Sequence, residues 1–346
     1  MITSRERVIK ALKHEKVDRP PRDLWALPGI SMFRQQELDE VLSLYPMDFI
    51  NPPVKYGKGE KEKGTPSEIG DYVDSFGSVW HVGERGVIGE VKDFPIKDWS
   101  DLDKYKLPWE VLRGADFSKV NEFCARTDKF VSTWPSASGS VSVNSGFNLF
   151  ERMQFLRGTE NLFIDLAYGK KEVYLLRDML HDFFMKEMKL WLKTDINAVA
   201  WADDWGAQDA LLISPDMWKD IFKPHYKDYV DLIHSYGKFA FMHSDGHIEA
   251  IYPDLVEIGV DAINSQLFCM DLNKLSQYKG KITFWGEIDR QWILPFGKPQ
   301  EVREAVRKVR NALDDDNGGV IAECEWGLNV PKENIIAVYD EWEKTR

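Results

Sequence analysis

Four side chains of metal-binding type stand at or just after short apolar runs of the sequence. His243 ends one run and Asp245 follows it, Glu287 follows a second run, and Cys324 ends a third. Imidazole, carboxylate and thiolate are ligands that zinc uses, and three protein ligands with one open position make a catalytic site. We therefore predict that His243, Asp245 and Cys324 bind zinc, which would lower the pKa of a bound thiol or water. The alternative is a hydrogen-bonded His-x-Asp surface pair, with Cys324 as core filler.

An adjacent pair of carboxylates, Asp203 and Asp204, follows another apolar run. Two neighbouring carboxylates can repel each other enough to raise one pKa, which suits a general acid or a clamp for a substrate hydroxyl or amine. Successive side chains of a strand diverge, so the alternative is that one of the two caps the next helix. We predict that Asp203, Asp204 and Glu287 are catalytic and either position the substrate or handle protons.

Aromatic residues are abundant, with 13 tryptophans in the chain. Most must lie in the core, but several follow apolar runs and would line the mouth of the fold with aromatic surface. A wide aromatic pocket with few polar anchors suits a flat or bulky organic ligand. The residues predicted to contact the substrate are Tyr72, Trp205, Gln266 and Trp285.

The order of the apolar runs predicts an α/β fold. Short β-rich runs alternate with longer helical patterns such as 215–236 and 299–313, which is typical of a parallel sheet with crossover helices. Eight such units close into a barrel, and barrel enzymes carry their reactive residues at the carboxyl ends of the strands. We therefore predict a single (β/α)8 TIM barrel. Its eight strands are predicted at 23–27, 48–51, 130–134, 198–202, 239–243, 262–266, 282–285 and 320–324.

Two segments are predicted to extend this barrel. A helix over 4–14, capped by Thr3 or Ser4, forms an N-terminal extension. Residues 56–96 are rich in Gly, Lys and Glu and then alternate between apolar and polar residues, which predicts a flexible lid followed by a β-hairpin. No internal repeat or linker is visible, so we predict one domain over 1–346.

The composition limits the class of protein. Of the 346 residues, 43% are hydrophobic and 29% are charged, so the chain can bury a large core. A net charge of −12 argues against a nucleic-acid partner. Cys124, Cys269 and Cys324 form an odd, sparse set that suits a reducing compartment. With neither a signal-peptide pattern nor an apolar stretch of roughly 18 to 20 residues, we predict a cytoplasmic protein without a membrane partner.

A set of short motifs is spread over nearly the whole chain. In one-letter code they are SRERVIKAL at 4–12, DRPP at 18–21, YVDSFGSVW at 72–80, DDWG at 203–206, ISPDMW at 213–218, HSDG at 243–246 and WGEID at 285–289, together with Cys324. In combination they resemble the uroporphyrinogen decarboxylase superfamily. Within it, the chain is similar to the branch of corrinoid-dependent methyltransferases that includes methylcobamide:coenzyme M methyltransferase, and the resemblance implies a barrel fold.

The resemblance also implies a zinc site. In the methyltransferases of that branch, zinc is held by a His-x-Cys pair after one strand and by a Cys near the carboxyl end. His243 matches the first ligand and Cys324 the last, whereas Asp245 stands where the family has its middle Cys. A carboxylate still binds zinc, but this harder site would activate a thiol acceptor differently. Either Cys269 compensates for the missing thiolate or the metal is absent, and both alternatives stay open.

The decarboxylase branch of the superfamily matches less well. True uroporphyrinogen decarboxylases hold propionate groups with arginines near the amino terminus and use an acidic residue to protonate the pyrrole. The corresponding segment 26–34 lacks that arginine-rich pattern. Arg34 alone cannot balance a substrate that carries eight carboxylates.

The sequence thus predicts a zinc-assisted methyltransferase that moves a methyl group between a corrinoid, free or carried by a partner protein, and a small acceptor such as a thiol or tetrahydrofolate. One alternative is a metal-independent decarboxylase, whose carbon dioxide release chelators would not affect. Another is a non-catalytic barrel that binds a corrinoid or other ligand tightly without turnover.

Overall fold

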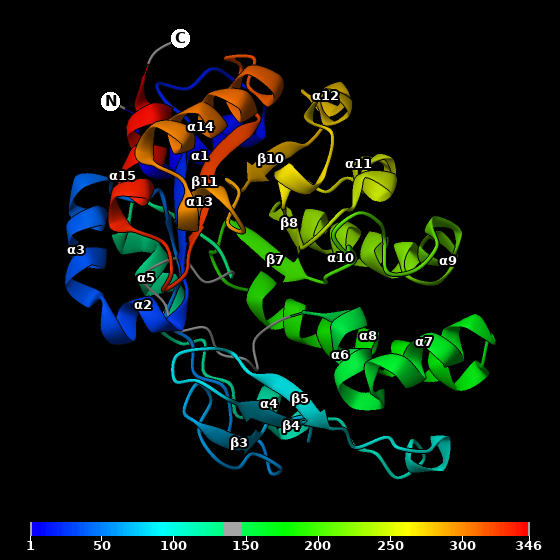
Figure 1. The fold of residues 1–346 in the computed structure, drawn as a ribbon. Helices are drawn as coiled ribbons and strands as arrows, with labels where there is room; N and C mark the ends of the chain where they lie inside the picture. Colours follow the sequence, from blue (N-terminus) through cyan, green and yellow to red (C-terminus); the bar gives the residue numbers. More distant parts are fainter. Residues whose placement is uncertain (1, 134–146, 345–346) are drawn as a thin grey trace.

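The computed structural model describes residues 2–133 and 147–344 of the chain. A curled, six-stranded parallel sheet forms its centre, in the order β1-β11-β10-β9-β8-β7 (Figure 1). Each neighbouring pair is parallel, so the carboxyl ends of all six strands lie at the same edge. The strands are β1 (Arg22–Ala26), β7 (Ala198–Ala202), β8 (Phe239–Ser244), β9 (Ala262–Ser265), β10 (Thr283–Gly286) and β11 (Val320–Trp326).

Two short strands form a separate parallel pair, β2 (Phe49–Ile50) and β6 (Phe130–Val131). This pair touches both outer strands of the large sheet. The amide of Asp48 donates to the carbonyl of Arg22 at 2.9 Å, and Ser132 forms a parallel bridge with Ala198. The half-barrel of six parallel strands agrees with the predicted α/β fold, whereas its closure by eight strands stays a prediction.

All eight predicted strands overlap observed strands. The predictions for 198–202 and 239–243 match within one residue, and the strand predicted at 320–324 continues to Trp326. Residue 134, the last of the strand predicted at 130–134, lies outside the described residues.

Helices cover the outer face of the sheet, as Figure 1 shows for α10 beside β8 and α15 beside β11. The capping box that Thr3 and Glu6 form begins the first helix, which ends at Leu12, two residues before the predicted end. No helix in the described ranges combines the length and the apolar character needed to cross a membrane. The α-helices are α1 (Ser4–Leu12), α2 (Pro28–Phe33), α3 (Gln35–Leu44), α4 (Trp109–Arg113), α5 (Val120–Arg126), α6 (Leu149–Arg157), α7 (Thr159–Ala167), α8 (Lys171–Leu192), α9 (Pro215–Ile221), α10 (Lys223–Ser235), α11 (Tyr252–Ile258), α12 (Leu272–Leu275), α13 (Ile293–Phe296), α14 (Pro299–Leu313) and α15 (Lys332–Glu343), and the 3₁₀ helices are η1 (Trp99–Asp101), η2 (Glu249–Ile251), η3 (Leu267–Cys269) and η4 (Ser276–Tyr278).

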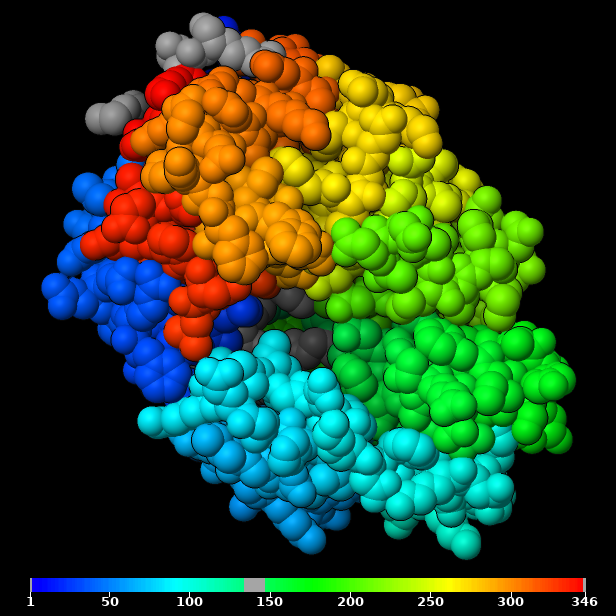
Figure 2. Space-filling view, viewed as in Figure 1, coloured from blue at the N-terminus to red at the C-terminus, as the bar shows by residue number. Residues whose placement is uncertain are grey.

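The segment predicted to carry a hairpin contains three antiparallel strands, β3 (Gly70–Val73), β4 (Val79–Val82) and β5 (Glu90–Asp93). A buried ion pair of 2.7 Å between Asp74 and Arg152 fastens this small sheet to α6. At Gly86, which has a φ of +88°, an added Cβ would come within 2.9 Å of the Gly29 Cα in α2. The small sheet therefore lies against elements from both sides of the barrel. Figure 2 shows a hollow between this sheet, in cyan, and the carboxyl-terminal elements, in orange and red.

Alternation along the strands creates two separate cores. Side chains that point inward pack on each other across the inside of the curled sheet and include Trp25, Phe241, Trp285 and Ile321. The side chains between them pack outward against the helices, as Cys324 does. Because successive residues of a strand face opposite sides, this alternation decides which polar residues at the strand ends can meet.

Candidate functional site

The inward-facing positions at the carboxyl ends of the strands are occupied almost entirely by polar residues. These positions face inward because they continue the alternation that places Phe241 and Trp285 on the inner face of the sheet. The polar residues on this inner face are Asp204 after β7, His243 and Asp245 at β8, Asn264 and Gln266 at β9, Glu287 and Arg290 after β10, and Glu323 and Glu325 in β11.

Asp204, His243 and Asp245 form the only group of three potential metal ligands among the residues that the structure describes. Their ligand atoms all lie within 4.8 Å of one another. The His243 Nε2 atom lies 3.5 Å from an Oδ1 atom of each aspartate. The Asp245 Oδ1 atom is buried and has no hydrogen-bond partner within the described ranges. The group therefore presents one nitrogen and two oxygens to a common point.

A chain of hydrogen bonds orients the His243 ring. Its Nδ1 lies 2.6 Å from the Asn264 Oδ1, and the Asn264 Nδ2 donates to Glu323 Oε2 at 3.1 Å. An amide that donates to Glu323 must present its oxygen to the ring, so His243 Nδ1 donates to Asn264 and Nε2 is the ring nitrogen that faces the two aspartates. Metal-binding histidines are held in this way by a second hydrogen-bonded group.

Arg290 joins three carboxylates on the other side of the group. Its Nη1 lies 2.7 Å from Glu325 Oε2, its Nε lies 3.3 Å from Glu287 Oε2, and its Nη2 contacts Asp245 Oδ2. Burial by itself lowers the pKa of Arg290, but Glu287, Asp245 and Glu325 together raise it above its usual range. Arg290 therefore stays charged and holds Asp245 with its second oxygen turned toward His243.

The remaining carboxyl groups of the site hold their protons more strongly than usual. Burial raises the pKa values of Glu287 and Glu323 well above the usual range of a glutamate. Burial and the neighbouring Asp245 raise the pKa of Asp204, and burial together with Asp204 raises that of Glu151. The site carries more carboxylates than cations and will favour a positive ligand.

Asp203 does not belong to this site, which corrects the prediction that it is catalytic. It is fully buried and faces the helices, where it accepts hydrogen bonds from the Glu151 amide in the first turn of α6 and from the Tyr226 hydroxyl, at 2.9 and 2.6 Å. Burial raises its pKa to about 7. Asp203 therefore does cap a helix, but the helix is α6, which precedes it in the sequence, and not the next helix as the alternative had it.

The aromatic residues predicted to contact the substrate are buried instead. Trp205 stacks on Phe150 behind the sheet with a centroid distance of 4.0 Å and is 0% exposed. Trp285 is 1% exposed in the barrel interior, and Tyr72 is 2% exposed in the insertion. Large aromatic rings contribute most when they are buried in a core, so these three residues leave little surface for a ligand. Of the predicted contacts, Gln266 lines the cavity described below.

Cys324 also lies away from the predicted metal site. Its thiol is fully buried on the outer face of β11 and lies 3.6 Å from the Tyr339 hydroxyl of α15. Glu323 and Glu325, on either side of it, face the interior, so alternation turns the sulfur away. Burial raises the pKa of this thiol well above its usual range. Asp204 takes the position in the group that was predicted for Cys324.

We predict that Cys324→Ala leaves zinc affinity unchanged within about twofold, because the thiol packs against a helix and not against His243. The lost side-chain contacts should lower the free energy of unfolding by about 1 kcal/mol. Zinc titration and guanidinium denaturation of the variant measure the two effects. A large loss of zinc affinity in a well-folded variant would restore Cys324 as a ligand.

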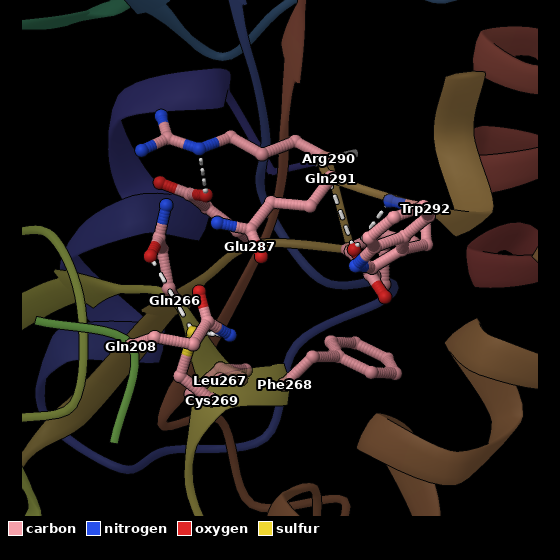
Figure 3. A pocket seen from close by; sticks show the side chains of 11 residues that line it. Gln208, Gln266, Leu267, Phe268, Cys269, Glu287, Arg290, Gln291 and Trp292 are labelled. Atoms are coloured by element: carbon pink, nitrogen blue, oxygen red, sulfur yellow. Dashed lines mark hydrogen bonds and ion pairs between the residues drawn. The ribbon is translucent and has the colours of Figure 1, made fainter.

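The cavity beside the metal group is lined by Gln266, Cys269 and Glu287 (Figure 3). The Cys269 sulfur lies 3.5 Å from Gln266 Oε1 and 3.5 Å from Gln208 Nε2, and it does not belong to the metal group. The predicted catalytic residue Glu287 is 2% exposed and lies within the site.

Several residues of the site were not predicted from the sequence. Arg290 follows Glu287 by three residues, a spacing at which the two side chains can pair. This spacing was the one feature of the sequence that could have indicated Arg290 as a site residue. Asn264 lies two residues before Gln266 and therefore on the same face of β9. Nothing in the sequence indicated Glu151 as a site residue, because it lies in a helix that is distant in sequence from the strand ends that form the site. Arg34, considered above for an anionic substrate, is occupied by Glu37 and by two backbone carbonyls.

Comparison with known proteins supports the fold described here. Residues 74–344 match the family model described as uroporphyrinogen decarboxylase (URO-D). A solved structure of a methyltransferase from Methanosarcina mazei has a TM-score of 0.71 and 14% sequence identity, over 99% of this chain and 98% of that one. At this identity the similarity shows the fold alone. No curated protein sequence matches the chain.

Proposed function

Because the chain belongs to the uroporphyrinogen decarboxylase family, we propose that it is a zinc-assisted methyltransferase that moves a methyl group between a corrinoid and a small acceptor. The observation that carries the proposal is the group of Asp204, His243 and Asp245 at the mouth of the barrel. Our sequence-based assignment of the metal ligands is revised accordingly, with Asp204 in place of Cys324. The proposal also includes closure of the eight strands into a barrel around this mouth.

The distances in this group suit zinc. With bonds of about 2.0–2.2 Å to nitrogen and oxygen, two ligand atoms of a tetrahedral ion lie about 3.3–3.6 Å apart. The His243 Nε2 atom is 3.5 Å from the Oδ1 atoms of both Asp204 and Asp245. Three such ligands leave one position open, and zinc bound there would lower the pKa of an acceptor thiol or of water.

Each residue of the site then has a task that its contacts support. Asn264 fixes the tautomer of His243, and Arg290 turns Asp245 toward the same point. Asp204 accepts a hydrogen bond of 2.9 Å from the Asp245 amide, which ties the ends of β7 and β8 together. Glu287 faces the adjoining cavity, where its carboxyl group can hold a proton or bind the substrate.

A corrinoid partner is supported by apolar side chains exposed after the strand ends. Phe33 after β1 is 50% exposed, and Trp292 and Phe296 after β10 are 69% and 72% exposed. Leu328 after β11 is 37% exposed. Exposed apolar groups that gather around one opening favour contact with another molecule, here a corrinoid or the protein that carries it.

The decarboxylase alternative is disfavoured by the charge of the site. Asp245, Glu287 and Glu325 surround a single arginine, Arg290, and Asp204 adds a fourth acidic group beside His243. A tetrapyrrole that carries many carboxylates would meet repulsion in this mouth, and each of its carboxylates would lack a cationic partner.

The proposal is tested by methyl transfer from methylcobalamin to 2-mercaptoethanol or tetrahydrofolate, followed by the absorbance change of the cobalamin. We expect turnover by the zinc-loaded protein, a loss of at least tenfold after chelation, and recovery when zinc is added back. Equal activity of metal-free and zinc-loaded protein would contradict the assigned role of the metal. Tight binding of cobalamin without turnover would favour the non-catalytic alternative.

We further predict that Asn264→Ala weakens zinc binding by about 10- to 100-fold, the usual effect of losing the group that orients a histidine ligand. Ser265→Ala is the matched control, because Ser265 faces outward and bonds the Tyr252 hydroxyl at 2.7 Å. Zinc titration of both variants measures the difference. Equal affinities would show that the Asn264 contact does not orient His243.

A further inference from the structure

A small cavity adjoins the metal group between η3 and the segment that follows β10 (Figure 3). Its volume is about 70 Å³. Since one water occupies roughly 10–15 Å³ measured in this way, the cavity has room for a ligand of about five non-hydrogen atoms. Its lining is Gln208, Gln266, Leu267, Phe268, Cys269, Glu287, Ile288, Asp289, Arg290, Gln291 and Trp292.

Among the residues that line the cavity, Glu287 is the one whose polar atoms lack hydrogen-bond partners. Its side chain is 2% exposed, and neither carboxyl oxygen has a hydrogen-bond partner in the described part of the chain. Its contact with Arg290 Nε is 3.3 Å, whereas Arg290 also holds Glu325 at 2.7 Å and Asp245. A buried carboxyl group without hydrogen bonds is costly, and in native proteins it marks a place that a ligand or water completes.

The charge around the cavity determines the sign of that ligand. Asp289 also lines the cavity, and Asp245 and Glu325 stand behind Arg290. With Asp204 and Glu287 there are five carboxyl groups against one guanidinium, so a dipositive ion at the metal group would still leave an excess of acidic groups. An anionic ligand is repelled here, and a cation is attracted.

Apolar and aromatic side chains share the remaining walls with Cys269 and three glutamines. Leu267 and Ile288 form the inner wall, Phe268 forms one side, and Trp292, 69% exposed, stands at the rim. Phe268 already attracts one cation, since the Lys308 ammonium lies 5.5 Å from the centre of its ring. Aromatic rings beside a carboxyl group suit an alkylated ammonium ion, because the alkyl groups contact the rings while the charge faces the carboxylate.

We propose that the small substrate of the methyl transfer is a methylated organic ammonium ion, which binds in this cavity with its nitrogen against Glu287 and its alkyl groups against Phe268 and Trp292. It would be the methyl donor: its C–N bond breaks as the methyl group passes to a reduced cobalt(I) corrinoid, and the neutral amine leaves with the electron pair of that bond. That the ammonium ion is a substrate rests on the proposed function. Its binding in the cavity does not depend on turnover. An ammonium substrate departs from our sequence-based expectation of a thiol or tetrahydrofolate as the small partner.

Binding is tested by titrating the zinc-loaded full chain with three probes of similar size and different charge: trimethylammonium, tert-butanol and propionate. We expect trimethylammonium to bind at least tenfold more tightly than either of the others. Glu287→Gln keeps the shape of the side chain and should reduce trimethylammonium affinity to that of tert-butanol. Trp292→Ala, at an exposed position that does not threaten folding, should weaken trimethylammonium binding severalfold. The control Glu304→Gln makes the same chemical change on the exposed surface of α14 and should have no effect.

The proposal is overturned if propionate or tert-butanol binds as tightly as trimethylammonium, or if Glu287→Gln and Trp292→Ala both leave the affinity unchanged. Zinc content, measured on the same samples, separates this result from failure of the proposed function. Zinc binding and methyl transfer without ammonium selectivity would refute the cavity assignment alone. Ammonium selectivity in a protein that binds no zinc would refute the proposed function and leave the cavity assignment standing.

Discussion

Replacing His243 with alanine is expected to lower zinc affinity by at least about 100-fold and to remove the proposed methyl transfer, because loss of a ligand exceeds the usual 10- to 100-fold cost of losing an outer partner. His243 supplies the only nitrogen in the group, and the two aspartates that remain would repel each other without it. Zinc titration and the methylcobalamin assay measure the two losses.

The matched control is His247→Ala, since His247 lies four residues further along and outside the metal group. It should keep the zinc affinity and the activity of the parent protein. If His243→Ala and His247→Ala behave alike, the site that we propose does not exist. A thermal melt of each variant shows whether any loss reflects unfolding.

Replacing Arg290 with methionine is expected to give the largest loss of stability, about 3–5 kcal/mol at pH 8, because it leaves buried charges without their partner. Three carboxylates, Asp245, Glu287 and Glu325, lose their shared cation. Methionine fills a similar volume, so most of the loss is electrostatic and not caused by a cavity.

The loss should shrink as the pH falls. Burial raises the pKa values of Glu287 and Glu325 above their usual range even with Arg290 present, and without it they should rise further. At a pH between the unfolded pKa of about 4.3 and these raised values, the folded state binds more protons than the unfolded state. Stability of the variant therefore falls as the pH rises through this window, and little of the penalty remains near pH 4.

Guanidinium denaturation at pH 5 and pH 8 measures this dependence. Arg85→Met is the control, because the Arg85–Glu68 pair is about half exposed and should contribute less than about 1 kcal/mol at either pH. An equal loss at both pH values for Arg290→Met would mean that Arg290 acts through packing and not through its charge.

The sequence predicted the strands well because each strand is a short β-rich run between helical patterns. The runs at 198–202 and 239–243 needed no tertiary information, since β-branched and aromatic residues between turn signals favour strands wherever they occur. Placing functional residues at the strand ends followed from the same pattern, and it located His243, Asp245 and Glu287 in the site.

Which face each residue occupies could not be predicted as directly. In β11 both faces are buried, so the side of the run that carries Glu323 and Glu325 does not by itself indicate whether it points to the interior or to the helices. The spacing of the sequence did not distinguish Glu323 from Cys324 as the residue that faces the site. We predicted Cys324 as the metal ligand because a thiolate binds zinc. The structure turns Glu323 inward to Asn264 and Cys324 outward to Tyr339.

The sequence by itself determined the residue types at the mouth and the strands that carry them, since hydrophobic pattern and chain order are local properties. Only the tertiary structure decided that Asp204 and not Cys324 joins His243, that Asp203 caps a helix, and that Arg290 balances the carboxylates. The physical reason is that a strand buried on both faces shows its orientation only through the neighbours against which it packs. A shift of one residue in register exchanges every inward side chain for an outward one.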